Sequence, residues 1–177
     1  ACFGTVSLAL EPGASRYATL LKNLHQDGTF IALDPNIRPF YATKAHSDFL
    51  YSLLPSVDLL KLSDEEEEFL DHPEAPIKVI TCGPDGLIVH FNGQTIEVNA
   101  PAIEVADTIG AGDTVIGCLL AEIHRRTGGK NVRSKTMEFV GEDWAEIASY
   151  AARAAAVTCT RVGANPPTRA EMEQLPK

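Results

Sequence analysis

The segment Asp107–Asp113, with the sequence Asp-Thr-Ile-Gly-Ala-Gly-Asp, places small residues between two carboxylates just before an apolar helical pattern. Backbone N–H groups at such a helix start can face an anion, and the helix dipole adds to the attraction. Gly110, Ala111 and Gly112 are therefore candidate anion-binding residues. The Asp113 carboxylate suits a general base that takes a proton from a hydroxyl while these amides stabilise a transferring phosphoryl group. The plainer interpretation is a tight turn into a helix, with an aspartate facing the helix dipole.

The composition narrows the class of protein. The chain has 177 residues, 45% of them hydrophobic, and 15 Lys+Arg against 24 Asp+Glu give it a formal net charge of −9. These values are typical of a globular domain and exclude collagen-like, low-complexity and disordered chains. Nucleic acid is not an expected partner, because no basic stripe is available to displace counterions. A membrane is not expected either, since no apolar run approaches the ~18 residues of a membrane span. Four cysteines without a C-x-x-C pair favour reduced thiols in a cytoplasmic protein.

Strand-like and helix-like segments alternate along the chain. Strands are predicted over Phe3–Leu10, Thr29–Leu33, Val57–Leu60, Ile77–Cys82, Leu87–Phe91 and Gln94–Val98. Helices are predicted over 17–24, 46–54, 115–123 and 144–160, with another that starts at Ser63. Asn92-Gly93 predicts a hairpin between the last two strands. The alternation predicts an α/β fold, a mostly parallel sheet with helices on both faces.

Asp107–Asp113 resembles the C-terminal signature D-T-x-G-A-G-D of the ribokinase/fructokinase (PfkB-type) sugar kinases, and the likeness is greatest to fructokinase-like members. Other segments match the family in the same order, namely Phe3–Leu8, Asp34–Pro39, Lys61–Glu66, Thr81–Gly86 and Arg161–Ala164. The resemblance implies a ribokinase-like fold in which residues 1–177 are the C-terminal part of a single sugar kinase domain. The N-terminal part and the lid over the sugar are then missing, and we expect the 177-residue chain alone to phosphorylate little or no sugar.

The resemblance also assigns roles on the phosphate-donor side. It implies that Asp113 is the catalytic base and that the amides of Gly110–Gly112 form the anion hole. Thr81, Gly83 and Gly86 match the T-x-G-x-x-G turn that approaches the nucleotide phosphates. These three residues also suit an ordinary turn between two strands, and both interpretations can hold because close approach to a phosphate needs glycine.

Ser63-Asp64-Glu65-Glu66 matches the family's N-x-x-E element, which orders Mg²⁺ and its waters. The resemblance implies that Glu66 faces Mg²⁺ through water and that Ser63 lies beside the nucleotide. Ser63 replaces the family's Asn, and Ala152 stands where many relatives have an Asn near the adenine. The Ser-x-x-Glu spacing is also a capping box. A helix can begin in this way and still offer Glu66 to metal-bound water.

Asp34-Pro35-Asn36-Ile37-Arg38 matches the D-P-N-x-R segment of fructokinase-like and 2-keto-3-deoxygluconate kinase-like members. A turn of this composition after a strand is common scaffolding. Arg38 can pair with phosphoryl oxygens or with an acid substrate, and Lys61 is a second, weaker cationic candidate. We assign Asp34, Asn36, Arg38 and Lys61 to the substrate and phosphate side of the site.

A set of residues matches positions that hold a monovalent cation in relatives, mainly through backbone carbonyls. The set comprises Asp107, Ile109, Thr158, Arg161 and Gly163. The resemblance thus adds K⁺ to ATP and Mg²⁺ as an expected cofactor.

The leading interpretation is an ATP-dependent fructokinase that converts fructose to fructose 6-phosphate. The near alternative is a 2-keto-3-deoxygluconate kinase, which shares the D-P-N-x-R segment and the signature. A catalytically silent relative that binds nucleotide or a protein partner is the alternative from another class, and a Rossmann or P-loop enzyme comes third. The expected partner is a small sugar or sugar acid, and the full-length protein is a candidate homodimer.

Overall fold

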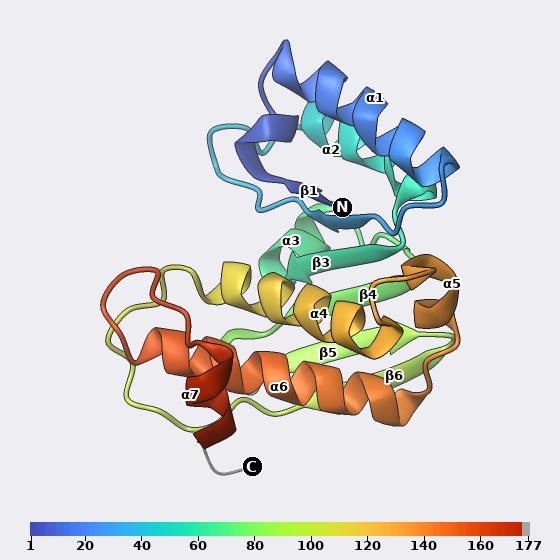
Figure 1. Ribbon diagram of the computed structural model, residues 1–177. Coiled ribbons are helices and arrows are strands. Elements are labelled where there is room, and N and C mark those ends of the chain that lie inside the picture. Colours follow the sequence, from blue (N-terminus) through green and yellow to red (C-terminus); the bar gives the residue numbers. More distant parts are fainter. Residues whose placement is uncertain (175–177) are drawn as a thin grey trace.

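The computed structural model describes residues 1–174, which form one six-stranded sheet with helices packed on it (Figure 1). The strands are β1 (Cys2–Gly4), β2 (Ala32–Asp34), β3 (Leu59–Ser63), β4 (Ile77–Thr81), β5 (Leu87–Phe91) and β6 (Gln94–Val98). They lie in chain order, with β1 to β4 parallel and β5 and β6 antiparallel. This mixed, mostly parallel sheet confirms the predicted α/β class.

Seven helices connect and cover the strands in the described part of the chain. They are α1 (Gly13–Gln26), α2 (Lys44–Tyr51), α3 (Asp64–Phe69), α4 (Ala111–Thr127), α5 (Val132–Met137), α6 (Gly141–Cys159) and α7 (Arg169–Gln174). Short 3-10 turns lie at Thr5–Leu8, Leu54–Ser56 and Gly83–Asp85. Periodicity predicted α4 and α6, whereas the short helices α5 and α7 were not predicted. No helix within residues 1–174 combines the length and apolar character needed to cross a membrane.

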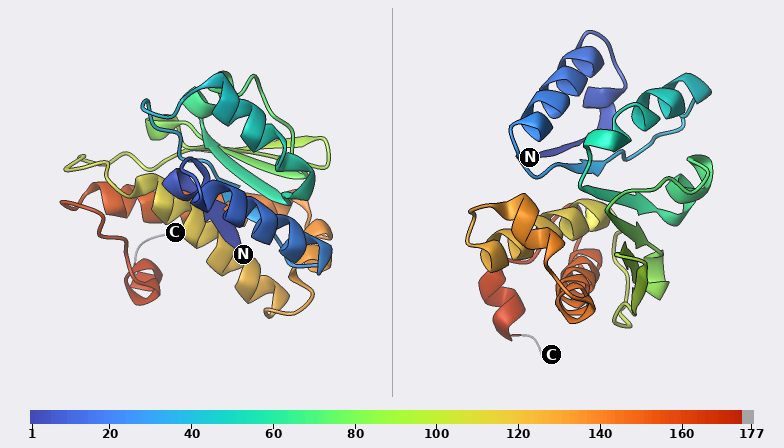
Figure 2. Two further views of the ribbon diagram at one scale, coloured as in Figure 1. Left: turned by 90° about the horizontal axis from the view of Figure 1, so that it is seen from above. Right: turned by 90° about the vertical axis from the view of Figure 1, so that its right-hand side faces the viewer.

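Two apolar cores lie on opposite faces of the sheet, because successive side chains of a strand point to opposite faces. Leu59 belongs to the core under α4 and α6, and its neighbour Leu60 belongs to the core under α1 and α2. The right-hand view of Figure 2 shows α4 and α6 together on one side of the hairpin strands. Fully buried Ala148 and Ala151 of α6 lie in the same core as Leu119 of α4, and such small side chains let helices approach closely.

The hairpin that Asn92-Gly93 predicted is confirmed. Both residues have positive φ, 49° and 72°, as a type I′ turn requires, and β5 pairs with β6 from Phe91↔Gln94 to Leu87↔Val98. β4 and β5 are antiparallel as well. The link between them is too short for the crossover that parallel strands need.

The strand predicted over Phe3–Leu10 is wrong beyond Gly4, because a 3-10 turn replaces it at Thr5–Leu8. Thr5 adopts a φ of 58°, and its N–H donates to the Pro35 carbonyl at 3.1 Å. The Ser7 hydroxyl then donates to the Gly4 carbonyl. These turn contacts outweigh the β propensity of the apolar residues that follow.

Gly117 lies in the middle of α4, and a Cβ added there would meet no heavy atom within 4 Å. Gly117→Ala should therefore raise the free energy of unfolding by about 0.5–1 kcal/mol, since alanine restricts the unfolded chain and favours helix. Gly128→Ala is the matched control, because Gly128 ends the same helix at a φ of 67° and alanine is strained there. Urea unfolding should move the two variants in opposite directions, and destabilisation by Gly117→Ala would contradict the prediction.

Candidate active site

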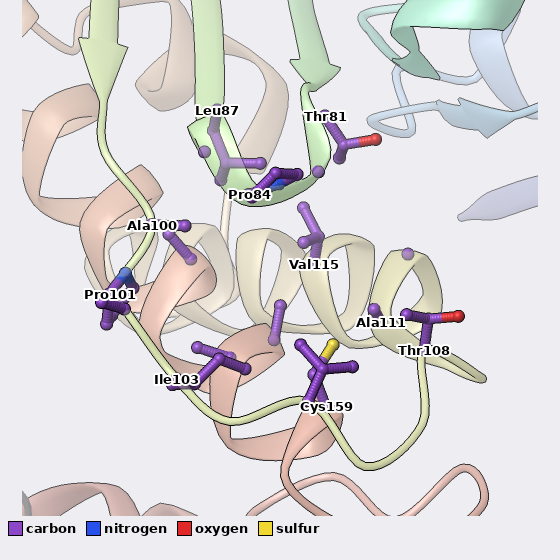
Figure 3. Close-up of a pocket in the computed structure, with 18 residues that line it drawn as sticks. Thr81, Pro84, Leu87, Ala100, Pro101, Ile103, Thr108, Ala111, Val115 and Cys159 are labelled. Carbon is purple, nitrogen blue, oxygen red and sulfur yellow. The ribbon is translucent and has the colours of Figure 1, made fainter.

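A cavity of about 600 Å³ opens between the turn after β4, the segment 100–105, the start of α4 and the C-terminal half of α6 (Figure 3). Its walls are mostly apolar and comprise Thr81, Gly83, Pro84, Gly86, Leu87, Ala100, Pro101, Ala102, Ile103, Val105, Thr108, Ala111, Gly112, Val115, Ala152, Ala155, Ala156 and Cys159. The cavity joins two sequence-predicted elements, the Thr81–Gly86 turn and the start of the Asp107–Asp113 helix. Ala152 of α6 lines it too.

The signature turns into α4 through Gly110, which caps the helix with a φ of 81°. A Cβ on Gly110 would come within 2.8 Å of the Ala164 Cβ, so the later motif packs directly on the helix start. Asp107 ties the two motifs together, because its carboxylate accepts from the Ile109 N–H at 3.1 Å and the Gly163 N–H at 2.9 Å. These backbone donors hold the pKa of Asp107 below its usual range.

Asp113 lies in the first turn of α4 with an exposed side chain, while Ala111 and Gly112 of the same turn line the cavity. The helix start is tied to α6 by a buried hydroxyl pair, Thr114 Oγ1 to Thr158 Oγ1 at 2.9 Å. The proposed base therefore stands on a rigid turn at the edge of the cavity.

The five residues assigned to a monovalent cation fall around one loop beside the signature. Asp107, Ile109 and Gly163 are joined by hydrogen bonds, and the Arg161 N–H donates to the Thr158 carbonyl. The Arg161 side chain does not face this loop as a ligand, because its guanidinium forms an ion pair with Glu171 at 2.6 Å. Among residues 1–174 no three His, Cys, Asp or Glu side chains cluster as metal ligands. A cation here would depend on backbone carbonyls.

Lys61 and Asp34 form a buried ion pair on neighbouring strands. The Lys61 Nζ lies 3.2 Å and 3.4 Å from the two Asp34 carboxylate oxygens. Burial raises the pKa of Asp34 to about 6, Lys61 counteracts that rise, and the nearby charges of Glu66 and Asp113 add to it. Both residues were predicted to lie on the substrate and phosphate side of the site. In the structure the Lys61 ammonium lies next to Gly112, because a Cβ added to Gly112 would be 3.0 Å from the Lys61 Nζ.

Glu66 joins two motifs that are far apart in the sequence. Its Oε2 accepts from the Ser63 N–H at 2.8 Å, and Ser63 Oγ accepts from the Glu66 N–H, which completes the capping box of α3. Its Oε1 accepts from the Ile37 N–H of the D-P-N-x-R segment at 2.5 Å. A carboxylate accepts about four hydrogen bonds, so lone pairs remain for a metal-bound water.

The turn after β4 depends on glycine. Gly86 has a φ of 104°, and a Cβ there would lie 2.0 Å from the Val98 carbonyl oxygen. Gly83 also has a positive φ, 53°, but faces open space. The Thr81 hydroxyl donates to the Leu62 carbonyl at 3.2 Å, which fixes the turn against β3.

Arg38 does not line the cavity. Its side chain is exposed and makes no hydrogen bond or ion pair within residues 1–174. Asn36 holds the bend before it with a φ of 47°, and its carbonyl accepts from the Tyr41 hydroxyl at 2.5 Å. The predicted role of Arg38 toward a substrate or phosphate therefore stays a prediction.

Comparison with known proteins identifies the family of this chain and the fold that it shares with solved structures. Residues 6–171 match the model of the pfkB family of carbohydrate kinases. The chain belongs to this family. A probable fructokinase-4 of Arabidopsis thaliana is 28% identical over 99% of the chain and 57% of its own length. A fructokinase of Xylella fastidiosa, solved with bound ATP, superposes with a TM-score of 0.82 at 20% identity, over 92% of this chain and 56% of that one.

An aminoimidazole riboside kinase of Salmonella enterica superposes on this PfkB chain almost as well, with a TM-score of 0.80 at 19% identity over 97% of this chain and 60% of that one. At such identities the superpositions establish the shared fold. The chain spans a little over half the length of these relatives.

Sequence reasoning missed one wall of the PfkB chain's cavity. Segment 100–105 forms this wall with Ile103 and Val105, which are partly exposed, and α6 contributes Ala155 and Cys159. Segment 100–105 has no helical or strand period that marks it. The apolar, small-residue face of α6 at Ala152, Ala155 and Cys159 was a signal that could have been used, because these residues recur at helical spacing.

Proposed function

We propose that this chain carries the phosphate-donor site and the catalytic base of an ATP-dependent sugar kinase. The observation that supports this most directly is the cavity that joins the Thr81–Gly86 turn to the first turn of α4, where Asp113 stands. An apolar cavity suits the adenine and ribose. The amides of Gly110 and Gly112 suit the phosphoryl group, whereas the Ala111 N–H donates to the Thr108 carbonyl at 3.3 Å.

The reaction uses these groups in a fixed order. The acceptor hydroxyl oxygen attacks the γ-phosphorus of ATP while its proton passes to the Asp113 carboxylate. The bond from that phosphorus to the bridging oxygen breaks, which leaves ADP and the phosphorylated sugar. The Gly110–Gly112 amides stabilise the charge on the transferring group. Mg²⁺, when bound, neutralises phosphate charge, and Glu66 is the residue that would face its waters.

Fructose is the first candidate acceptor, because several similar sequences are named as fructokinases or probable fructokinases. A 2-keto-3-deoxy sugar acid is the second, and the exposed guanidinium of Arg38, which has no ion-pair partner among residues 1–174, favours it. A fructokinase of Vibrio cholerae was solved with fructose, ADP and a potassium ion, and we extend K⁺ to the backbone carbonyls around Asp107, Ile109 and Gly163 of this chain. A cytoplasmic homodimer remains our expectation for the complete gene product.

Two measurements test this function. The complete gene product should bind ATP and phosphorylate fructose, whereas the isolated 177-residue chain should transfer little or no phosphate. A panel of acceptors that includes 2-keto-3-deoxygluconate separates the two candidates, since turnover with the acid and none with fructose would overturn the first. ATP binding without transfer to any acceptor would instead favour a silent relative.

A further inference from the structure

A buried cation lies directly beneath the phosphate-binding turn. Lys61 and Asp34 are each only 5% exposed, and a Cβ on Gly112 would stand 3.0 Å from the Lys61 Nζ. Lys61 lies on the α4 face of the sheet, because the register pairs it with Val79, a member of the core under α4. Asp34 lies on the same face, because it follows Ala32 of that core by two residues along β2. Gly112 leaves the ammonium room against the helix start.

This placement is unfavourable for stability alone. The N-terminus of a helix carries a partial positive charge, so a lysine beside the first turn of α4 is repelled by the dipole. Burial of an ion pair also carries a desolvation cost that its own attraction often fails to repay. The pair is moreover loose, since its 3.2 Å and 3.4 Å contacts are longer than the ~2.8 Å of a strong charge-assisted hydrogen bond.

The same features become favourable once an anion occupies the turn. The charge of Lys61 and the dipole of α4 then attract the same ligand, and the low dielectric of a buried site strengthens both effects. Local arrangements that disfavour the fold are expected at functional sites.

A second buried lysine provides an internal comparison. Lys78 on β4 pairs with Glu67 of α3 at 2.9 Å, and its side chain is as buried as that of Lys61. The register pairs Lys78 with Leu60, which faces the core under α1 and α2, so Lys78 lies on the other face of the sheet. Lys78 is thus a buried lysine on the face of the sheet away from Gly110–Gly112, and its partner Glu67 also contacts the His72 ring at 3.2 Å.

We propose that Lys61 supplies a fixed positive charge to the phosphoryl group held at Gly110–Gly112, and that Asp34 is the positioning residue that keeps the Lys61 ammonium under Gly112. This inference rests on the proposed function and adds to the backbone amides a side chain that discriminates the terminal phosphate. It predicts that Lys61 matters more for ATP than for ADP, because only ATP has a γ-phosphate to place at this turn.

The test removes the pair without leaving a buried unpaired charge. The double variant Asp34→Asn with Lys61→Met is compared with the matched control Glu67→Gln with Lys78→Met, both in the complete gene product. Calorimetry with ATP and with ADP should show that the first variant weakens ATP binding about tenfold and ADP binding less than about twofold. The control should change neither, although both variants alter a buried pair. The kcat for sugar phosphorylation should fall in the first variant with little change in the KM for the sugar.

Each outcome decides the inference. Equal weakening of ATP and ADP binding, or the same ATP loss in the control, would show that the pair only supports the fold. If the single variant Lys61→Met does not fold, the double variant still carries the comparison. Failure of the unaltered protein to bind ATP at all would instead refute the proposed function.

Discussion

Asp113→Asn is expected to lower kcat for sugar phosphorylation by about 10²- to 10⁴-fold, the usual contribution of a general base. Asparagine has nearly the same shape but cannot take up the proton of the acceptor hydroxyl. Because Asp113 is exposed and its side chain makes no hydrogen bond within residues 1–174, the variant should fold normally. Loss of its charge from the start of α4 should change stability by less than about 1 kcal/mol.

The measurement is steady-state kinetics of the complete gene product together with ATP titration. ATP affinity should stay within about threefold, since loss of one carboxylate near the phosphates removes repulsion rather than a contact. Asp27→Asn, at an exposed aspartate just after α1, is the control and should leave kcat unchanged. An Asp113→Asn protein that keeps most of its turnover would remove Asp113 from the role of base.

Gly86→Ala should destabilise the protein by about 3 kcal/mol and weaken ATP binding. Gly86 holds a φ of 104°, and a Cβ would lie 2.0 Å from the Val98 carbonyl oxygen and 2.7 Å from the Ala100 nitrogen. Backbone strain and overpacking each contribute about 1–3 kcal/mol in such a case. The clash pushes apart the turn and the segment that form two walls of the cavity, so nucleotide affinity should fall along with stability.

The control variant Gly93→Ala separates the effect of backbone strain from the effect of a steric clash. Gly93 also has a positive φ, 72°, but nothing lies within 4 Å of its Cβ position in the hairpin turn. The free energy of unfolding of the Gly93→Ala variant should fall by only about 1 kcal/mol, which is the strain of a left-handed residue. Its ATP binding should be unaffected. Urea unfolding and calorimetry of both variants provide the test, and equal losses in the two would contradict the role of the contact with Val98.

Local sequence was sufficient for several helices and strands, and it also motivated a hypothesis about the chemistry at their ends, which stays a prediction. The stripe Val115, Leu119 and Ile123 predicted α4, and the small residues before it predicted an anion site at its start. Asn92-Gly93 predicted the hairpin, and Ser63-x-x-Glu66 predicted a capping box that the structure contains. These features depend on residues within one or two turns of each other, where periodicity and turn chemistry act.

Other features depend on tertiary structure. The turn after Gly4 could not be predicted from local sequence, because the Pro35 carbonyl holds it through a hydrogen bond. The hydrogen bond from the Ile37 N–H to the Glu66 carboxylate likewise joins distant segments. The pairing of Lys61 with Asp34 needs the parallel register of β2 and β3, and its place under Gly112 needs α4 to lie close above that sheet. Such contacts join segments far apart in the chain, so only strand register and helix packing decide them.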